Sequence, residues 1–153
     1  MSVEALLKRM SKGDDIPSIS PVVDLSNAVC LQYRVPIGTH DIDSLIDDIE
    51  IRYVKDSDVF EGVEDSSGFD RDEGVYASGN SIRTRRWIWR QMPAGRISPN
   101  SKNLVFPVDG FTANKETILK ARDELASRLK QYFGCNTLVG LIDKESPSFK
   151  ITG

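Results

Sequence analysis

Histidine and cysteine are scarce in this chain of 153 residues, which contains one histidine and two cysteines. His40, Cys30 and Cys135 do not form a cluster with the spacing of a zinc site. We therefore expect no metal and no cofactor. Two cysteines far apart in the sequence also favour a reduced, cytoplasmic protein over one held together by disulfides.

Long apolar runs, internal repeats and low-complexity segments are missing as well. No run approaches the roughly 20 apolar residues that a membrane helix needs, and the first residues lack the apolar block of a signal peptide. We therefore expect no membrane segment. The net charge of −3 argues against a general nucleic-acid binder, but it permits docking of one RNA end at a locally basic surface.

The composition that remains predicts a single folded domain, because 39% of the residues are hydrophobic and a chain of this length can bury roughly two thirds of its unfolded surface. Helical and strand patterns mix without a regular βαβ alternation, which favours an α+β fold. We expect a mixed or antiparallel sheet packed with two main helices. The predicted parts are an N-terminal helix and linker (1–14), a main domain (15–143) and a frayed tail (144–153).

The first main helix has clear boundary signals. Ser20 can cap it, and Pro21 suits its first turn because the missing N–H would be unpaired there. The helix is expected to end after Arg34, since Pro36 disfavours helical backbone before it and Gly38 permits an unusual turn.

The second main helix is predicted over residues 115–133, with Asn114 as its N-cap and Gly134 as its stop. The shorter elements are predicted as follows: a helix at 2–11, a short helical or turn segment at 42–48, and strands at 49–54, 75–78, 81–90, 103–108 and 137–143. The strands at 75–78 and 81–90 flank Gly79 and Asn80, a loop length typical of a hairpin. The acidic stretch 56–73 is interpreted as a solvated loop.

One candidate site lies where the first helix ends. His40 could act as a base with Asp41 orienting it, and the alternative is a loop histidine without a catalytic role. Asn27 and Asp24 share one face of the apolar helix, where a buried amide and carboxylate need partners.

A second candidate site is the stretch 83–96, which concentrates five arginines in an acidic chain. Alternation along the predicted strand 81–90 places Arg83, Arg85, Trp87 and Trp89 on one face. Arginine suits phosphate or carboxylate, and tryptophan offers a face on which a base can stack. The alternative is that the Trp rings are core and that the arginines pair with the acidic loop.

Three sequence patterns together resemble a known family. Val-Asp-x-x-Asn-x-Val at 23–29, followed by Pro-Ile at 36–37, and SKNLVFPVDGF at 101–111 are similar to the tRNA-editing (B3/B4) domain of phenylalanyl-tRNA synthetase β chains. Stand-alone relatives of that domain share Arg-Arg-Trp-x-Trp-Arg, which stands here at 85–90. These relatives usually carry a further N-terminal segment, so this chain is either naturally short or lacks that part. If the segment covers the core in the relatives, we expect some apolar surface to be exposed here.

The resemblance implies an α+β editing-domain fold and association with tRNA. In the family, a histidine stands two residues after the proline that corresponds to Pro36. This chain has Gly38 at that position, and its histidine, His40, follows two places later. The family's glutamate falls on Pro107, with Asp109 two places beyond it. The site residues expected from this comparison are His40 as the catalytic residue and, for substrate binding, Asn27, Gly38, Asp41, Arg85, Trp87, Trp89, Arg90 and Gln91.

The resemblance leaves two functions open. The first is a tRNA-associated domain that could hydrolyse mischarged aminoacyl-tRNA in trans, as an aminoacyl-tRNA deacylase. The second is a non-catalytic module that binds an RNA end, an amino-acid-like small molecule or a partner protein.

Overall fold

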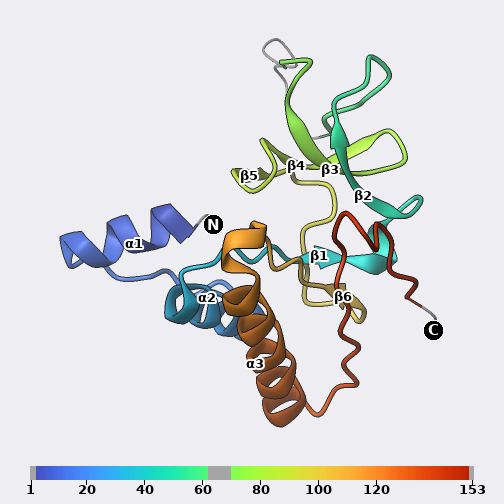
Figure 1. Ribbon diagram of the computed structural model, residues 1–153. Coiled ribbons are helices and arrows are strands. Elements are labelled where there is room, and N and C mark those ends of the chain that lie inside the picture. Colours follow the sequence, from blue (N-terminus) through green and yellow to red (C-terminus); the bar gives the residue numbers. More distant parts are fainter. Residues whose placement is uncertain (1–2, 62–69, 152–153) are drawn as a thin grey trace.

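The computed structural model describes residues 3–61 and 70–151, so the centre of the predicted acidic loop lies outside the described residues (Figure 1). The described chain forms an α+β fold, as predicted, and it contains three α-helices and two antiparallel sheets instead of a single sheet. None of the helices in the described ranges is long and apolar enough to cross a membrane.

Helix α2 (Pro21–Tyr33) begins and ends where its sequence signals predict. The Ser20 hydroxyl accepts a hydrogen bond from the Val23 N–H, and Pro21 occupies the first turn. Arg34 closes the helix in the left-handed conformation, with φ of 54°. Helix α1 (Val3–Lys12) precedes α2, buries Leu6 and contacts α2.

Helix α3 (Lys115–Phe133) ends at Gly134, whose φ of 62° and hydrogen bond to the Lys130 carbonyl provide the predicted stop. A short 3-10 helix, η2 (Thr112–Asn114), leads into α3. Asn114 occupies the N-cap position, but its side chain accepts from the Phe111 N–H at 2.8 Å instead of capping α3. Helices α2 and α3 pack against each other over a buried apolar cluster of Val29, Val35, Ala121, Leu125 and Leu129.

A two-stranded ribbon joins the helices to the rest of the fold. Strand β1 (His40–Asp41) pairs antiparallel with β6 (Leu104–Val105), and an isolated bridge between Ile37 and Val108 extends the pairing. The segments 36–41 and 104–109, which contain the Pro-Ile of the first family pattern and most of the second pattern, therefore run side by side. Figure 1 shows this ribbon between the helix pair and the larger sheet. The short 3-10 helix η1 (Ile42–Ser44) follows β1.

The larger sheet has four antiparallel strands in the order β2-β3-β4-β5. Their bounds are β2 (Ile49–Tyr53), β3 (Gly74–Ser78), β4 (Ser81–Arg85) and β5 (Arg90–Gln91). The hairpin predicted at Gly79 and Asn80 joins β3 to β4, and Gly79 has the positive φ that such a turn requires, 58°. A second apolar cluster of Phe60, Val75, Ala77, Ile82 and Met92 belongs to this sheet.

The predicted strand 81–90 is wrong beyond Arg85. Residues 86–89 form a turn in which Arg86 and Trp87 have positive φ values of 44° and 59°. The chain therefore reverses, and β5 returns alongside β4. Because a turn interrupts the alternation, the expected single face of Arg83, Arg85, Trp87 and Trp89 does not exist.

The predicted strand 137–143 is also wrong, because these residues form no strand and have no sheet neighbour among the described residues. Arg122 on α3 donates to the Gly140 carbonyl at 3.2 Å, and the Phe149 ring packs closely on Gly140. The segment is thus held by side chains instead of a ladder of backbone hydrogen bonds. The predicted strand 103–108 shortens to β6, which ends before Pro107.

Candidate functional site

A buried polar cluster connects the four-stranded sheet with the segment that follows β6. Tyr76 on β3 donates its hydroxyl proton to Oδ1 of Asp109 at 2.5 Å, and the Trp87 indole N–H donates to the same oxygen at 3.1 Å. Asp109 is 8% exposed. Burial raises the pKa of Asp109 above its ordinary value, although the two hydrogen bonds favour the charged form. The cluster therefore joins β3, the β4–β5 turn and the segment after β6.

His40 belongs to this cluster and is only 1% exposed. Its ring lies 5.6 Å from the Tyr76 ring, and its Nδ1 has no hydrogen-bond partner in the described part of the chain. Burial disfavours the imidazolium and the charge of Arg83 repels it, so the pKa of His40 is lowered to about 4. His40 is therefore neutral at neutral pH and enclosed.

Asp41, expected to orient His40, instead fixes the loop that follows. Its Oδ1 accepts the Asp43 N–H at 3.0 Å, and its Oδ2 accepts the hydroxyl of Ser101. Its backbone N–H donates to the Gly95 carbonyl at 3.1 Å. One carboxylate oxygen of Asp41 thus caps η1, and the other holds the segment that contains Ser101.

Gln91 and Gly38 lie where the turn after α2 meets the end of the Arg-Trp stretch. The Gln91 side-chain amide donates to the Thr39 carbonyl at 2.5 Å. The Gly38 N–H donates to the Pro107 carbonyl at 2.9 Å, and a Cβ added at Gly38 would lie 3.6 Å from Nε2 of His40. The structure therefore brings Gln91, Gly38 and His40 into one region.

Arg83 is a buried arginine, 3% exposed, that holds η1 against the sheet. Its Nη2 donates to the Ser44 carbonyl at 2.9 Å, and its aliphatic stem packs on Gly95. Its Nε has no partner within the described ranges. We conclude that Arg83 supports the fold and the electrostatics of His40 and offers no surface to a ligand.

Arg85 forms a buried ion pair with Glu73, the residue that precedes β3. Nε and Nη2 of Arg85 lie 3.0 and 2.9 Å from the two carboxylate oxygens of Glu73. Burial disfavours the charged carboxylate, but the bonds from Arg85 and from the Arg86 N–H outweigh it, so the pKa of Glu73 lies below its ordinary value. Arg85 therefore pairs with a carboxylate of the acidic stretch, which is the alternative to ligand binding for these arginines.

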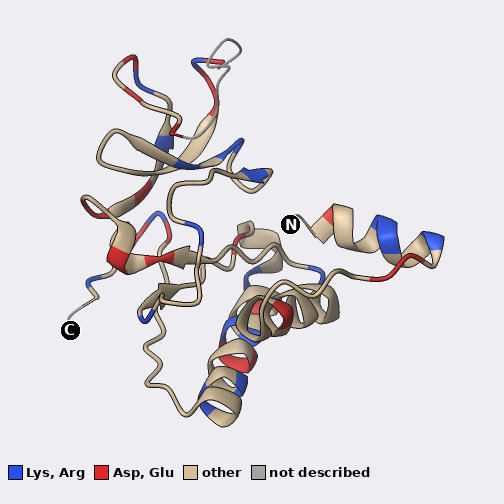
Figure 2. Cartoon of the chain, turned by 180° about the vertical axis from the view of Figure 1, so that it is seen from behind, with Lys and Arg blue, Asp and Glu red and all other residues tan. Residues whose placement is uncertain are grey.

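The remaining arginines of the stretch are on the surface. We call Arg86, Trp89, Arg90 and Arg96 the basic–aromatic surface. The Arg86 guanidinium lies 5.0 Å over the Trp89 ring, and Trp89 is 51% exposed. Arg90 and Arg96 are also exposed. Figure 2 shows basic positions gathered at the β4–β5 end of the sheet.

The turn that presents this surface is unfavourable by itself. Left-handed backbone costs a non-glycine residue roughly 1 to 2 kcal/mol, and Arg86 and Trp87 adopt it in succession. The Trp87 ring is half-buried, with the exposed Phe111 ring packed edge-on at 5.3 Å. The packing of the Trp87 ring against Phe111 therefore helps to hold the turn in place.

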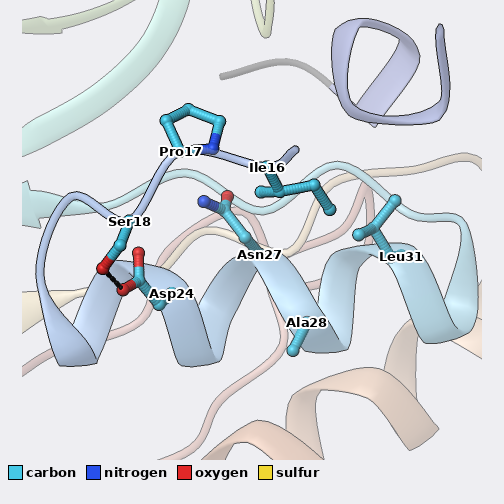
Figure 3. A pocket seen from close by; sticks show the side chains of 7 residues that line it. All are labelled: Ile16, Pro17, Ser18, Asp24, Asn27, Ala28 and Leu31. Carbon is cyan, nitrogen blue, oxygen red and sulfur yellow. Dashed lines mark hydrogen bonds between the residues drawn. The ribbon is translucent and has the colours of Figure 1, made fainter. Parts of the chain in front are cut away.

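Asn27 lies in a different environment from the cluster. It is buried and lines a shallow hollow of about 270 Å³ between α2 and residues 16–18, as Figure 3 shows. Its Nδ2 has no partner among the residues described. Asp24, on the same face, accepts the Ser18 hydroxyl at 2.5 Å and the Ile19 N–H at 2.9 Å, so it fixes the segment before α2.

Cys30 is buried in α2, and burial raises the pKa of its thiol, which makes it a poor nucleophile. The described residues contain no group of three or more His, Cys, Asp or Glu that could hold a metal ion.

Sequence reasoning missed Tyr76 and Glu73 as site residues and did not commit to Asp109. Nothing in the sequence near Tyr76 or Glu73 separates them from ordinary strand and loop residues. A signal for Asp109 existed, because it stands two places after the position of the family's glutamate.

Comparison with known protein families supports the sequence resemblance. The model of the B3/4 domain family matches residues 1–134 of this chain. The match spans all three helices, both sheets and every candidate site residue. Neither the curated proteins nor the solved structures contain a match.

Proposed function

Because the chain belongs to the B3/4 domain family, which relates it to tRNA synthetases, we propose that it binds the unpaired, aminoacylated end of a tRNA. The basic–aromatic surface would make the contact. The observation that carries the proposal is the exposed Arg86–Trp89 stack, flanked by Arg90 in a chain of net negative charge.

The chemistry of this surface suits unpaired nucleotides. Exposed guanidinium groups contact phosphate oxygens, and an exposed indole offers its face to a base. In a duplex the base faces are hidden by stacking, whereas an unpaired end leaves them accessible. A surface of four side chains can hold only a short segment, which fits the end of an RNA.

Binding accounts for the geometry better than ester hydrolysis does. A general base must reach the proton that it removes, and His40 is enclosed. With a pKa near 4, His40 is also a weak base, and Asp41 does not orient it. Hydrolysis would require the ribbon or the turn to open around the ligand.

A second candidate ligand is an amino-acid-like small molecule at the hollow beside Asn27. The unpartnered Asn27 amide N–H favours a ligand that has a carbonyl or carboxylate oxygen. Titration calorimetry with free amino acids, using Asn27→Leu as the control, tests this candidate without involving RNA.

The main proposal is tested with end-labelled aminoacyl-tRNA, followed by fluorescence anisotropy. The matched control is the same tRNA without its unpaired 3′ nucleotides. We expect the intact tRNA to bind at least tenfold more tightly, since stacking on an aromatic side chain contributes about 1 to 3 kcal/mol per base. Equal affinity for both RNAs would contradict recognition of the end.

The same tRNAs distinguish binding from hydrolysis. Correctly and incorrectly charged tRNAs are incubated with the protein, and release of the amino acid is measured. We expect release no faster than in buffer. Faster release that His40→Ala abolishes would establish the deacylase function instead.

A further inference from the structure

Glu73 gathers three hydrogen bonds on one buried carboxylate. Besides the two bonds from Arg85, its Oε1 accepts the backbone N–H of Arg86 at 2.8 Å. The residue is 5% exposed. One carboxylate thus binds the last side chain of β4 and the first backbone amide of the turn.

Gly74, the first residue of β3, completes the attachment. The Trp87 N–H donates to the Gly74 carbonyl at 2.6 Å. Residues 73 and 74 therefore hold Arg86 and Trp87, two successive non-glycine residues with left-handed backbone. Because these residues disfavour that conformation, the turn depends on its bonds to the start of β3.

We propose that Glu73 is a positioning residue for RNA-end binding: its carboxylate holds the 86–89 turn in the conformation that stacks Arg86 on Trp89. This inference rests on the proposed function of the basic–aromatic surface. Glu73 itself is buried and does not contact the ligand. Its effect passes through the backbone N–H of Arg86.

A carboxylate is required because one side chain must serve both partners. Two anionic oxygens can accept the fork of Arg85 and the Arg86 N–H together. A glutamine amide has one acceptor oxygen, and its NH₂ group would face a donor of Arg85. Glu73→Gln removes the negative charge and the Oε2 contact with Nη2 of Arg85, so it should weaken the hold on the turn while keeping almost the same side-chain volume.

The chain offers a matched control beside strand β2. The Asp58 side chain is also buried and pairs with the fork of Arg52, with both distances 2.7 Å. These contacts do not involve the turn. Asp58→Asn thus removes a comparable ion pair without touching residues 86–89.

The test uses protein labelled with 5-fluorotryptophan, whose two fluorine resonances report Trp87 and Trp89. We expect Glu73→Gln to shift or broaden both resonances and to weaken binding of aminoacyl-tRNA about tenfold, the scale of a lost charge-assisted hydrogen bond. Asp58→Asn should leave both resonances and the affinity near those of the wild type. Unchanged resonances and affinity in Glu73→Gln would overturn the inference.

If Glu73→Gln does not fold, the same measurements are made on a second variant. Glu73→Asp keeps the charge but shortens the side chain, so that it cannot reach Arg85 and Arg86 together; we expect shifted resonances and about threefold weaker binding. Unchanged spectra and affinity in this variant would also overturn the inference. If the resonances move but the wild type binds no tRNA, Glu73 holds the turn and the proposed function fails.

Discussion

The Tyr76 hydroxyl donates to Oδ1 of Asp109 across 2.5 Å, and this bond links the four-stranded sheet to the segment that packs on the helices. Tyr76 stands between Val75 and Ala77 of the sheet cluster, and Asp109 follows Val108, which packs on the helical cluster. The bond therefore joins the two halves of the core through polar groups.

Removing the acceptor at this junction should destabilise the protein. Asp109→Leu leaves the Tyr76 hydroxyl and the Trp87 indole N–H without a hydrogen-bond acceptor. We therefore expect the free energy of unfolding to fall by about 2 to 4 kcal/mol. Asp109→Asn keeps an acceptor oxygen and removes the buried charge, so its effect should stay within about 1 kcal/mol. Urea unfolding measures both. Equal losses for the two variants would show that the charge, not the acceptor, is required.

His40 should make stability depend on pH. Its native pKa is about 4, whereas an unfolded histidine has a pKa of about 6.5. Above pH 6.5 neither state is protonated. As pH falls from 6.5 to 4 only the unfolded state takes up the proton, so stability is lost at up to about 1.4 kcal/mol per pH unit, roughly 3 kcal/mol in all.

Other groups in the region titrate too, so the measurement is a difference between proteins. The raised pKa of Asp109 acts in the opposite direction, because the native state takes up that proton first. Subtracting the unfolding free energies of His40→Gln from those of the wild type isolates His40. A difference that stays constant between pH 4 and 6.5 would contradict the burial of a neutral histidine.

The fold was largely predictable from the sequence because its signals are local. Ser20 with Pro21, and Gly134, mark the ends of α2 and α3 through their own backbone chemistry. The hairpin at Gly79 likewise depends on a single residue with positive φ. Such features need no knowledge of distant contacts.

The site was harder to predict because tertiary contacts override local pattern there. Strand alternation fails at Arg86, where the Glu73 carboxylate and the Gly74 carbonyl hold the backbone in a turn. The segment 137–143 has the composition of a strand but finds no sheet edge. His40 is the residue predicted to act as a base, yet it is buried, and its ring lies near that of Tyr76, far away in the sequence.

The arginines of one short stretch should separate into two classes. Arg85→Glu places a second carboxylate against buried Glu73, and breaking such a pair costs roughly 3 to 5 kcal/mol. Arg90 is exposed, so Arg90→Glu should change the free energy of unfolding by less than about 0.5 kcal/mol. Chemical denaturation of both variants checks this. Similar values for the two would contradict the division into structural and surface arginines.

The basic–aromatic surface is proposed to bind an RNA end. The most direct measurement is the affinity for end-labelled aminoacyl-tRNA of Arg86→Glu combined with Arg90→Glu. The charge-matched control is the double reversal of Lys120 and Lys130, which lie exposed on α3. We predict that the arginine reversals weaken binding by about a hundredfold at low salt while the lysine reversals change it only about twofold. Equal losses in both proteins would show that binding is non-specific, and would contradict the account.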